Sequence, residues 1–195
     1  MINIDNLPQC TLKKTSKYKI NDKVYYMTHS DLGCVDFDKA KEEYTSQLEF
    51  SELPKSVDAL FSFCNDVFLI EFKSGRLAKK EIYGIRLKIF DSLLMLTDML
   101  KIDISHTQQK FKFILVYNEE KNPFSEEENE EMRKLGLSPA PARTEIAKNI
   151  ANKTTNKKFI RFSLSRFEKL YFNEVFTVTK DEFESKYIQA WSKTQ

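Results

Sequence analysis

The stretch "SVDALFSFCNDVFLIEFKSG", Ser56 to Gly75, decides the fold expected for this chain. Its apolar, aromatic and β-branched residues predict two short strands that meet at a tight turn formed by Cys64 and Asn65. A two-residue turn fixes the hairpin register and places Asp58 directly across from Glu71. The hairpin is therefore expected to bring two acids together at one end of otherwise apolar strands.

These two acids need a compensating positive charge. Directly opposed residues project to the same face with Cβ atoms about 4.5–5.5 Å apart, and two carboxylates at that distance repel. Lys73 joins them because strand side chains return to the same face every second residue. A divalent cation is the expected compensation, since Mg²⁺ takes one or two carboxylates and keeps sites for water and phosphate. The alternative is an exposed sheet end with an ordinary salt bridge between Lys73 and its neighbours. Asp58, Glu71 and Lys73 are therefore the predicted catalytic residues of a metal-assisted hydrolysis.

The same residues resemble a known motif, that of the PD-(D/E)XK nuclease superfamily, which includes type II restriction enzymes, Holliday-junction resolvases and RecB-like nucleases. The matching elements are Asp58 on one strand, "EFK" at Glu71 to Lys73 on the next, an acidic helix before them, and a long helix and a strand after them. The resemblance covers residues 37–118. It implies a restriction-endonuclease-like core in which Asp58 and Glu71 bind Mg²⁺ or Mn²⁺, Lys73 assists the attacking water, and an acid of the first helix completes the metal shell.

The acid of the first helix can be chosen from helical geometry. An apolar stripe marks the core face of the helix expected over residues 37–49, and its members are Phe37, Ala40, Tyr44 and Leu48. At about 100° per residue, Glu43 falls about 105° from the centre of this stripe and Glu42 about 155°. Glu43 is therefore the predicted third metal ligand.

Basic residues follow the second strand of the hairpin in "KSGRLAKK". Arg76, Lys79, Lys80 and Arg86 are the predicted phosphate contacts, which fix the position of a nucleic acid without reading its bases. Other basic residues gather in "TLKKTSKYKINDK" and "AKNIANKTTNKKFIR", and acids gather in "NEEKNPFSEEENEEM". Because 31 basic residues are nearly balanced by 29 acids, net charge alone does not decide for nucleic acid, and a solvated face stays the alternative for each run.

Periodicity predicts one α/β (mixed α+β) domain over residues 1–195, a central mixed β-sheet flanked by helices, with its nuclease-like core at 37–118. A right-handed β-α-β crossover is expected to make the strand at 110–117 parallel to the second hairpin strand. The other expected elements before the C-terminal part are strands around an Asn21-Asp22 turn, a helix at 79–101 and an acidic loop excursion at 119–145. The C-terminal part, 157–191, is expected to contain strands at 159–164 and 174–179, a short helix at 165–171 and a last helix from Thr179 to near Trp191.

Cysteine and histidine usage excludes several site classes. The three cysteines form no CxxC pair, and the two histidines have no paired spacing, so neither a disulfide framework nor a zinc site is predicted. Any metal is therefore expected to be bound by oxygen. No run of about 18 apolar residues and no signal-peptide pattern is found, so a soluble cytoplasmic protein without a membrane partner is expected.

The expected function is that of a Mg²⁺-dependent endonuclease that hydrolyses phosphodiester bonds in nucleic acid, with DNA as the favoured substrate. Restriction, phage defence and DNA repair are all compatible contexts, and so are a homodimer and a larger defence complex. Two alternatives stay open at this point. One is a non-catalytic nucleic-acid-binding or assembly module with an inherited nuclease-like fold, and the other is an RNA-cleaving, toxin-like endonuclease.

Overall fold

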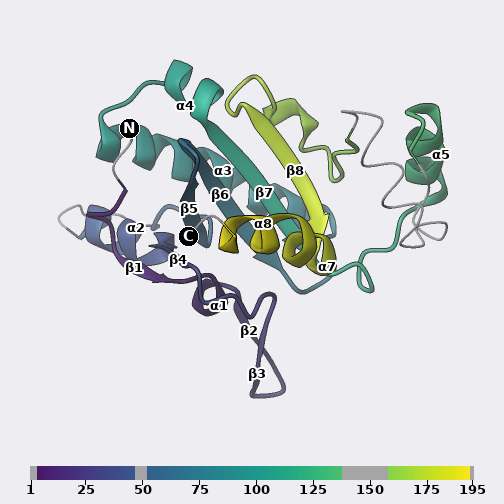
Figure 1. The fold of residues 1–195 in the computed structure, drawn as a ribbon, viewed down its shortest axis with the longest axis horizontal. Coiled ribbons are helices and arrows are strands. Elements are labelled where there is room, and N and C mark those ends of the chain that lie inside the picture. The colour runs from purple at the N-terminus through teal and green to yellow at the C-terminus, as the bar shows by residue number, and fades with distance from the viewer. Residues whose placement is uncertain (1–3, 47–51, 138–157, 194–195) are drawn as a thin grey trace.

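A six-stranded mixed sheet lies at the centre of the computed structural model, which describes residues 4–46, 52–137 and 158–193 (Figure 1). The strands, in their order across the sheet, are β1 (Gln9–Thr11), β4 (Gly33–Asp36), β5 (Ala59–Phe63), β6 (Asp66–Lys73), β7 (Phe111–Tyr117) and β8 (Glu174–Thr179). Neighbours from β1 to β6 pair antiparallel, whereas β6, β7 and β8 run parallel. The predicted fold class, a mixed sheet flanked by helices, is confirmed.

The β5–β6 hairpin has the predicted register. Ala59 pairs with Ile70, and the turn residues Cys64 and Asn65 have positive φ angles of 48° and 68°. Two consecutive left-handed residues are typical of a type I′ turn, whose twist matches that of the flanking strands. The residue that precedes β5 therefore faces the last residues of β6.

Helix α3 (Lys79–Leu100) makes the crossover from β6 to β7, and the parallel pairing that it implies is confirmed. It packs on one face of the sheet together with α2 (Phe37–Thr45), in a core that contains Leu69 and Phe113. The hydroxyl of Tyr44 on α2 also donates to Asp98 of α3 at 2.9 Å. Positions 47–49, the end of the predicted first helix, lie outside the described residues.

The opposite face of the sheet is covered by the C-terminal helix (Figure 1). This helix consists of α7 (Lys180–Phe183), a π-helical turn η3 (Glu184–Ile188) and α8 (Gln189–Ser192). Thr179 and Glu182 form the predicted capping box at its start, which is confirmed. No helix in the described part of the chain is long and apolar enough to cross a membrane.

A second, two-stranded sheet projects from the body of the molecule (Figure 1). It is the hairpin of β2 (Lys17–Ile20) and β3 (Lys23–Tyr26), and its turn residues Asn21 and Asp22 have positive φ angles of 46° and 61°. The predicted strands around this turn are thus confirmed. The short helix α1 (Leu12–Thr15) leads into the hairpin.

The predicted strand at 159–164 is wrong. Phe162 and Ser163 have positive φ angles of 60° and 53°, which an extended strand does not allow. Arg161, directly before this turn, is buried, and its Nε donates to Oε1 of Glu128 at 2.9 Å. The remaining elements are α4 (Ile104–Lys110), α5 (Glu126–Lys134) and the 3₁₀ turn η2 (Ser165–Phe167). Helix α5 lies in the predicted acidic excursion, and η2 is found where a helix was predicted at 165–171. Residues 138–157 lie outside the described part.

Candidate active site

Asp58, Glu71 and Lys73 meet at the end of the β5–β6 hairpin. Asp58 directly precedes β5, and its backbone amide donates to the carbonyl of Ile70 at 3.1 Å, which continues the strand pairing by one residue. Glu71 of β6 is fully buried, at 0% exposure, on the sheet face that α3 covers. The Nζ of Lys73 lies 2.7 Å from Oε1 of Glu71. The structure thus brings the three predicted side chains together.

Lys88 of α3 is a fourth member of this cluster, and it is not among the site residues predicted from sequence. Its Nζ lies 3.1 Å from Oδ1 of Asp58, 2.8 Å from Oε1 of Glu71 and 2.9 Å from Oε2 of Glu71. One ammonium therefore bridges both carboxylates. The positive charge that the two acids need is present within the chain itself, as Lys73 and Lys88.

A sequence signal for Lys88 exists in the helical pattern. Ile85 and Ile89 belong to the buried stripe of α3. Lys88 lies three residues after the first and one before the second, so it flanks that stripe instead of facing solvent. A lysine in such a position can bury its stem and still reach a carboxylate with its ammonium.

The charges of the cluster shift one another's proton affinities. Burial raises the pKa of Glu71 and the nearby Asp58 carboxylate raises it further, against the lowering effect of Lys88 and Lys73, so that it reaches about 7. Burial lowers the pKa of Lys88, but Asp58 and Glu71 outweigh burial and leave it raised. Lys88 is therefore protonated at neutral pH, whereas Glu71 is poised to exchange a proton.

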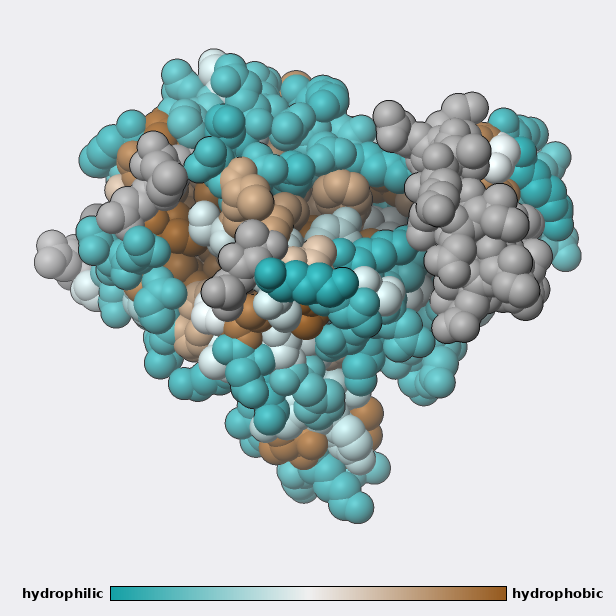
Figure 2. Space-filling view, in the orientation of Figure 1, coloured by the Kyte–Doolittle hydropathy of each residue, from teal (hydrophilic) through white to brown (hydrophobic). Residues whose placement is uncertain are grey.

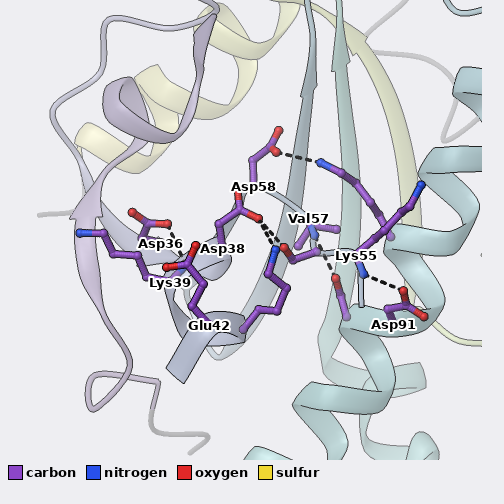
Figure 3. A network of polar contacts seen from close by, with 12 residues as sticks. Asp36, Asp38, Lys39, Glu42, Lys55, Val57, Asp58 and Asp91 are labelled. Carbon is purple, nitrogen blue, oxygen red and sulfur yellow. Dashed lines mark hydrogen bonds and ion pairs between the residues drawn. The ribbon is translucent and has the colours of Figure 1, made fainter. Parts of the chain in front are cut away.

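Helix α3 also fixes the segment that leads to Asp58 (Figure 3). The backbone amide of Val57 donates to Oγ of the buried Ser92 at 2.9 Å, and the amide of Lys55 donates to Oδ2 of Asp91 at 2.8 Å. The Oδ2 of Asp58 itself accepts from a β6 backbone amide at 2.7 Å. The position of Asp58 is thus set by two elements before any ligand binds.

The structure does not bring Glu43 into this cluster. Glu43 is exposed on α2, and no hydrogen bond or ion pair among the described residues joins its carboxylate to Asp58 or Glu71. The α2 acid with a contact to the segment before β5 is Asp38, which accepts from the hydroxyl of Ser56 (Figure 3). Within the described ranges, no group of three His, Cys, Asp or Glu side chains is arranged to hold a metal ion.

Three of the four predicted nucleic-acid contacts are exposed beside the cluster in the chain. Arg76 lies in the loop after β6, and Lys79 and Lys80 form the first turn of α3. Arg86 is half-buried, and its Nε is buried without a hydrogen-bond partner among the residues described. Exposed cations therefore follow Lys73 directly, while Arg86 is less accessible.

The raised pKa of Glu71 predicts that the free energy of unfolding in EDTA changes with pH differently in wild type and in Glu71→Gln. The folded protein binds this proton more tightly than the unfolded chain, so the contribution of Glu71 to the free energy of unfolding falls as pH rises from about 4.5 to about 7. Glu71→Gln should lack this fall. Urea unfolding of both proteins between pH 4.5 and 8 measures the free energy of unfolding at each pH. The same pH dependence in both proteins would contradict the raised pKa of Glu71.

The cluster is thus a pair of carboxylates bridged by one lysine and contacted by a second, at the end of a sheet and next to exposed cations. Comparisons of this chain with known protein families, with curated proteins and with solved structures found no match. The chemistry of these four side chains is therefore the basis for assigning a function.

Proposed function

We propose that this chain is a Mg²⁺- or Mn²⁺-dependent nuclease that hydrolyses phosphodiester bonds in DNA. The convergence of Asp58, Glu71 and Lys73 at one end of the β5–β6 hairpin supports the proposal most directly. Two carboxylates with a lysine beside them are a donor set suited to metal-assisted attack of water on a phosphodiester. Exposed cations in the following segment, Arg76 and Lys79 among them, are suited to hold the anionic backbone of the substrate.

The carboxylates of Asp58 and Glu71 fit a divalent cation. A single ammonium already touches both of them, so one ion can reach both as well. The buried Oε1 of Glu71 receives no hydrogen bond of good geometry from the described residues, although two ammonium groups lie within 2.8 Å. Asp58 and Glu71 would therefore hold the ion, which when bound lowers the pKa of a coordinated water and offsets charge on the phosphate.

The two lysines have different roles in this proposal. Among the described residues, the ion pair of Lys73 is with Glu71, and its ammonium would orient the attacking water or stabilise charge on the phosphate. Lys88 contacts both carboxylates that would hold the cation, so its ammonium and a bound ion would compete for them. Its flexible stem and protonated state allow it to pair with a substrate phosphate instead.

One observation favours a second function, that of a non-catalytic nucleic-acid-binding module. Two carboxylates and two ammonium groups balance each other without any metal, with every N–O distance between 2.7 and 3.1 Å. A nuclease-like site that has lost its metal would look the same. Metal binding, and not only cleavage, therefore has to be measured.

Cleavage of nucleic acid is expected to require Mg²⁺ or Mn²⁺ and to fall at least about 100-fold in Glu71→Ala and in Lys73→Ala, because each change removes charge stabilisation at the reacting phosphate. Purified protein is incubated with plasmid, single-stranded DNA and RNA, with metal or with EDTA. Lys121→Ala is the matched control, since Glu119 and Lys121 repeat the acid-x-Lys spacing on an exposed loop.

The outcomes separate the candidate functions. Equal cleavage by wild type and both site variants indicates a contaminating nuclease and overturns the proposal. Cleavage of RNA alone assigns an RNA-cleaving, toxin-like activity. If no substrate is cleaved and Mn²⁺ leaves the melting temperature of wild type unchanged, the non-catalytic module is supported, because an ion that binds only the folded state must stabilise it.

A further inference from the structure

The β2–β3 hairpin carries the first basic run of the sequence, which the proposed active site does not use. Within the hairpin, from Lys17 to Tyr26, Tyr18 and Tyr26 are partly buried and the other residues are exposed. The hairpin follows β1 and α1 at the β1 edge of the main sheet and projects away from the body of the molecule (Figure 1). Glu71 and Lys73 lie on β6, three positions inward from that edge in the strand order.

The exposed surface of the hairpin combines cations with large apolar side chains. The hairpin carries three exposed lysines, Lys17, Lys19 and Lys23, and one acid, Asp22. The exposed apolar side chains are Ile20 at 52%, Val24 at 41% and Tyr25 at 41%. Figure 2 shows the resulting mixture of hydrophobic and hydrophilic residues on the protrusion at the bottom of the molecule. A projecting arm with three lysines is complementary to a polyanion, and its apolar groups can pack against sugars and base edges.

The base of the hairpin is firmly held, although an isolated two-stranded ribbon is only marginally stable in water. The backbone of Ser16 accepts from the amide of Met27 at 3.0 Å, and its hydroxyl donates to the carbonyl of Thr28 at 3.2 Å. The rings of Tyr18 and Tyr25 stack across the strands with centroids 5.7 Å apart. The ribbon is therefore a preformed arm rather than a loop that must order on binding.

We propose that the β2–β3 hairpin is a DNA-contacting arm that enters the major groove of the duplex on which the active site acts; this rests on the proposed function. A two-stranded ribbon fits the major groove of B-DNA, which is about 12 Å wide, whereas the major groove of A-form RNA is too deep and narrow. The lysines contact phosphates on either side of the groove, and the exposed side chains Ile20, beside the turn, and Tyr25, nearer the base, contact base edges.

Lysines on a free strand edge also have a structural use, since they prevent edge-to-edge association of ribbons. That use accounts for the charge but not for three large apolar side chains left exposed beside it. Self-association through the hairpin is therefore the main competing interpretation, and sedimentation of wild type and variants reports on it directly.

The test measures binding of a fluorescent DNA duplex by the full-length protein in EDTA, where metal-dependent cleavage is absent, over a range of salt concentrations. A variant with Lys17, Lys19 and Lys23 all changed to Gln is compared with a control in which Lys101, Lys134 and Lys193 are changed to Gln. The control removes the same charge from other exposed positions. The arm variant is expected to bind at least tenfold more weakly at low salt, with a salt slope smaller by about 2 to 3, while the control stays close to wild type.

Each outcome is distinguishable from failure of the proposed function. If wild type binds duplex DNA and both triple variants lose affinity equally, the hairpin is no arm, but the nuclease proposal stands. If wild type binds no DNA at any salt concentration, the arm is overturned, whereas the nuclease proposal is decided separately by the cleavage assay with metal. If the arm variant keeps its DNA affinity and instead loses a concentration-dependent dimer, the hairpin is a contact between copies of this chain.

Discussion

Replacing Lys88 by methionine is expected to lower the free energy of unfolding by about 3 kcal/mol in metal-free buffer. Removal of one partner from a buried ion pair typically costs about 3–5 kcal/mol, because the remaining charge stays buried without compensation. Here the ammonium of Lys88 contacts two carboxylates, one of which is fully buried. The loss should stay near the lower end of that range, since Glu71 can take up a proton when Lys88 is absent.

Urea unfolding in EDTA measures this loss. Lys80→Met is the control, since Lys80 is exposed on the same helix and its replacement should change stability by no more than about 0.5 kcal/mol. Adding Glu71→Gln to Lys88→Met should recover part of the loss, because the double variant no longer holds two neighbouring carboxylates with only Lys73 to offset them. A loss as small as that of Lys80→Met would show that the bridge contributes little. Stabilisation by Mn²⁺ should be larger in Lys88→Met than in wild type if the ion and the ammonium compete for one place.

Arg161→Leu is expected to destabilise the protein by about 3–5 kcal/mol, through the acidic helix α5 and not through the active site. Arg161 is 4% exposed and binds Glu128 with two hydrogen bonds of 2.9 and 2.8 Å. It also donates to the carbonyls of Asn122 and Pro123 at 2.8 and 3.1 Å, and its guanidinium lies 4.0 Å from the ring centroid of Phe124. Leucine keeps much of the volume but leaves these acceptors, including a carboxylate, without their donor.

Chemical unfolding of Arg161→Leu, with Arg166→Leu as the control, tests this expectation. Arg166 lies close by in the chain and is exposed, so its replacement should be nearly neutral. Arg161→Lys should recover little, because a lysine cannot make the paired hydrogen bonds of a guanidinium to a carboxylate. Equal stability of the leucine and lysine variants with wild type would mean that α5 is held by other contacts.

The elements that sequence predicted well are those fixed by neighbouring residues. The turn at Cys64 and Asn65 determines the register of β5 and β6, because a two-residue turn leaves one pairing that keeps the apolar faces together. The apolar stripe of α3 determines that β7 follows as a parallel neighbour. The segment at 159–164 alternates like a strand, but Arg161 binds a residue 33 positions earlier in the chain, and that distant contact overrides the local pattern.

The candidate site was predictable in part for the same reason. Asp58, Glu71 and Lys73 share one hairpin, so strand geometry alone brings them together. Lys88 arrives from α3, and its reach to both carboxylates depends on how that helix docks on the sheet. Sequence indicated that two opposed acids require a positive charge and placed Lys73 beside them, but it could not show that α3 supplies a second ammonium that contacts both. Glu43 was predicted as the third metal ligand from helical angles alone, but the α2 acid that contacts the segment before β5 is Asp38, because that contact also depends on how α2 packs.

The bridge between hairpin and helix also has a consequence for the order of folding. The β5–β6 hairpin involves only local contacts and can form early, but by itself it holds the carboxylates of Asp58 and Glu71 opposite each other. Lys73 of the same hairpin contacts Glu71, but the ammonium that contacts both carboxylates is that of Lys88, which reaches them only when α3 docks. Hairpin formation and helix docking should therefore be tightly coupled in the transition state. A Lys88 substitution is then expected to slow folding more than it speeds unfolding, and stopped-flow kinetics would reveal this asymmetry.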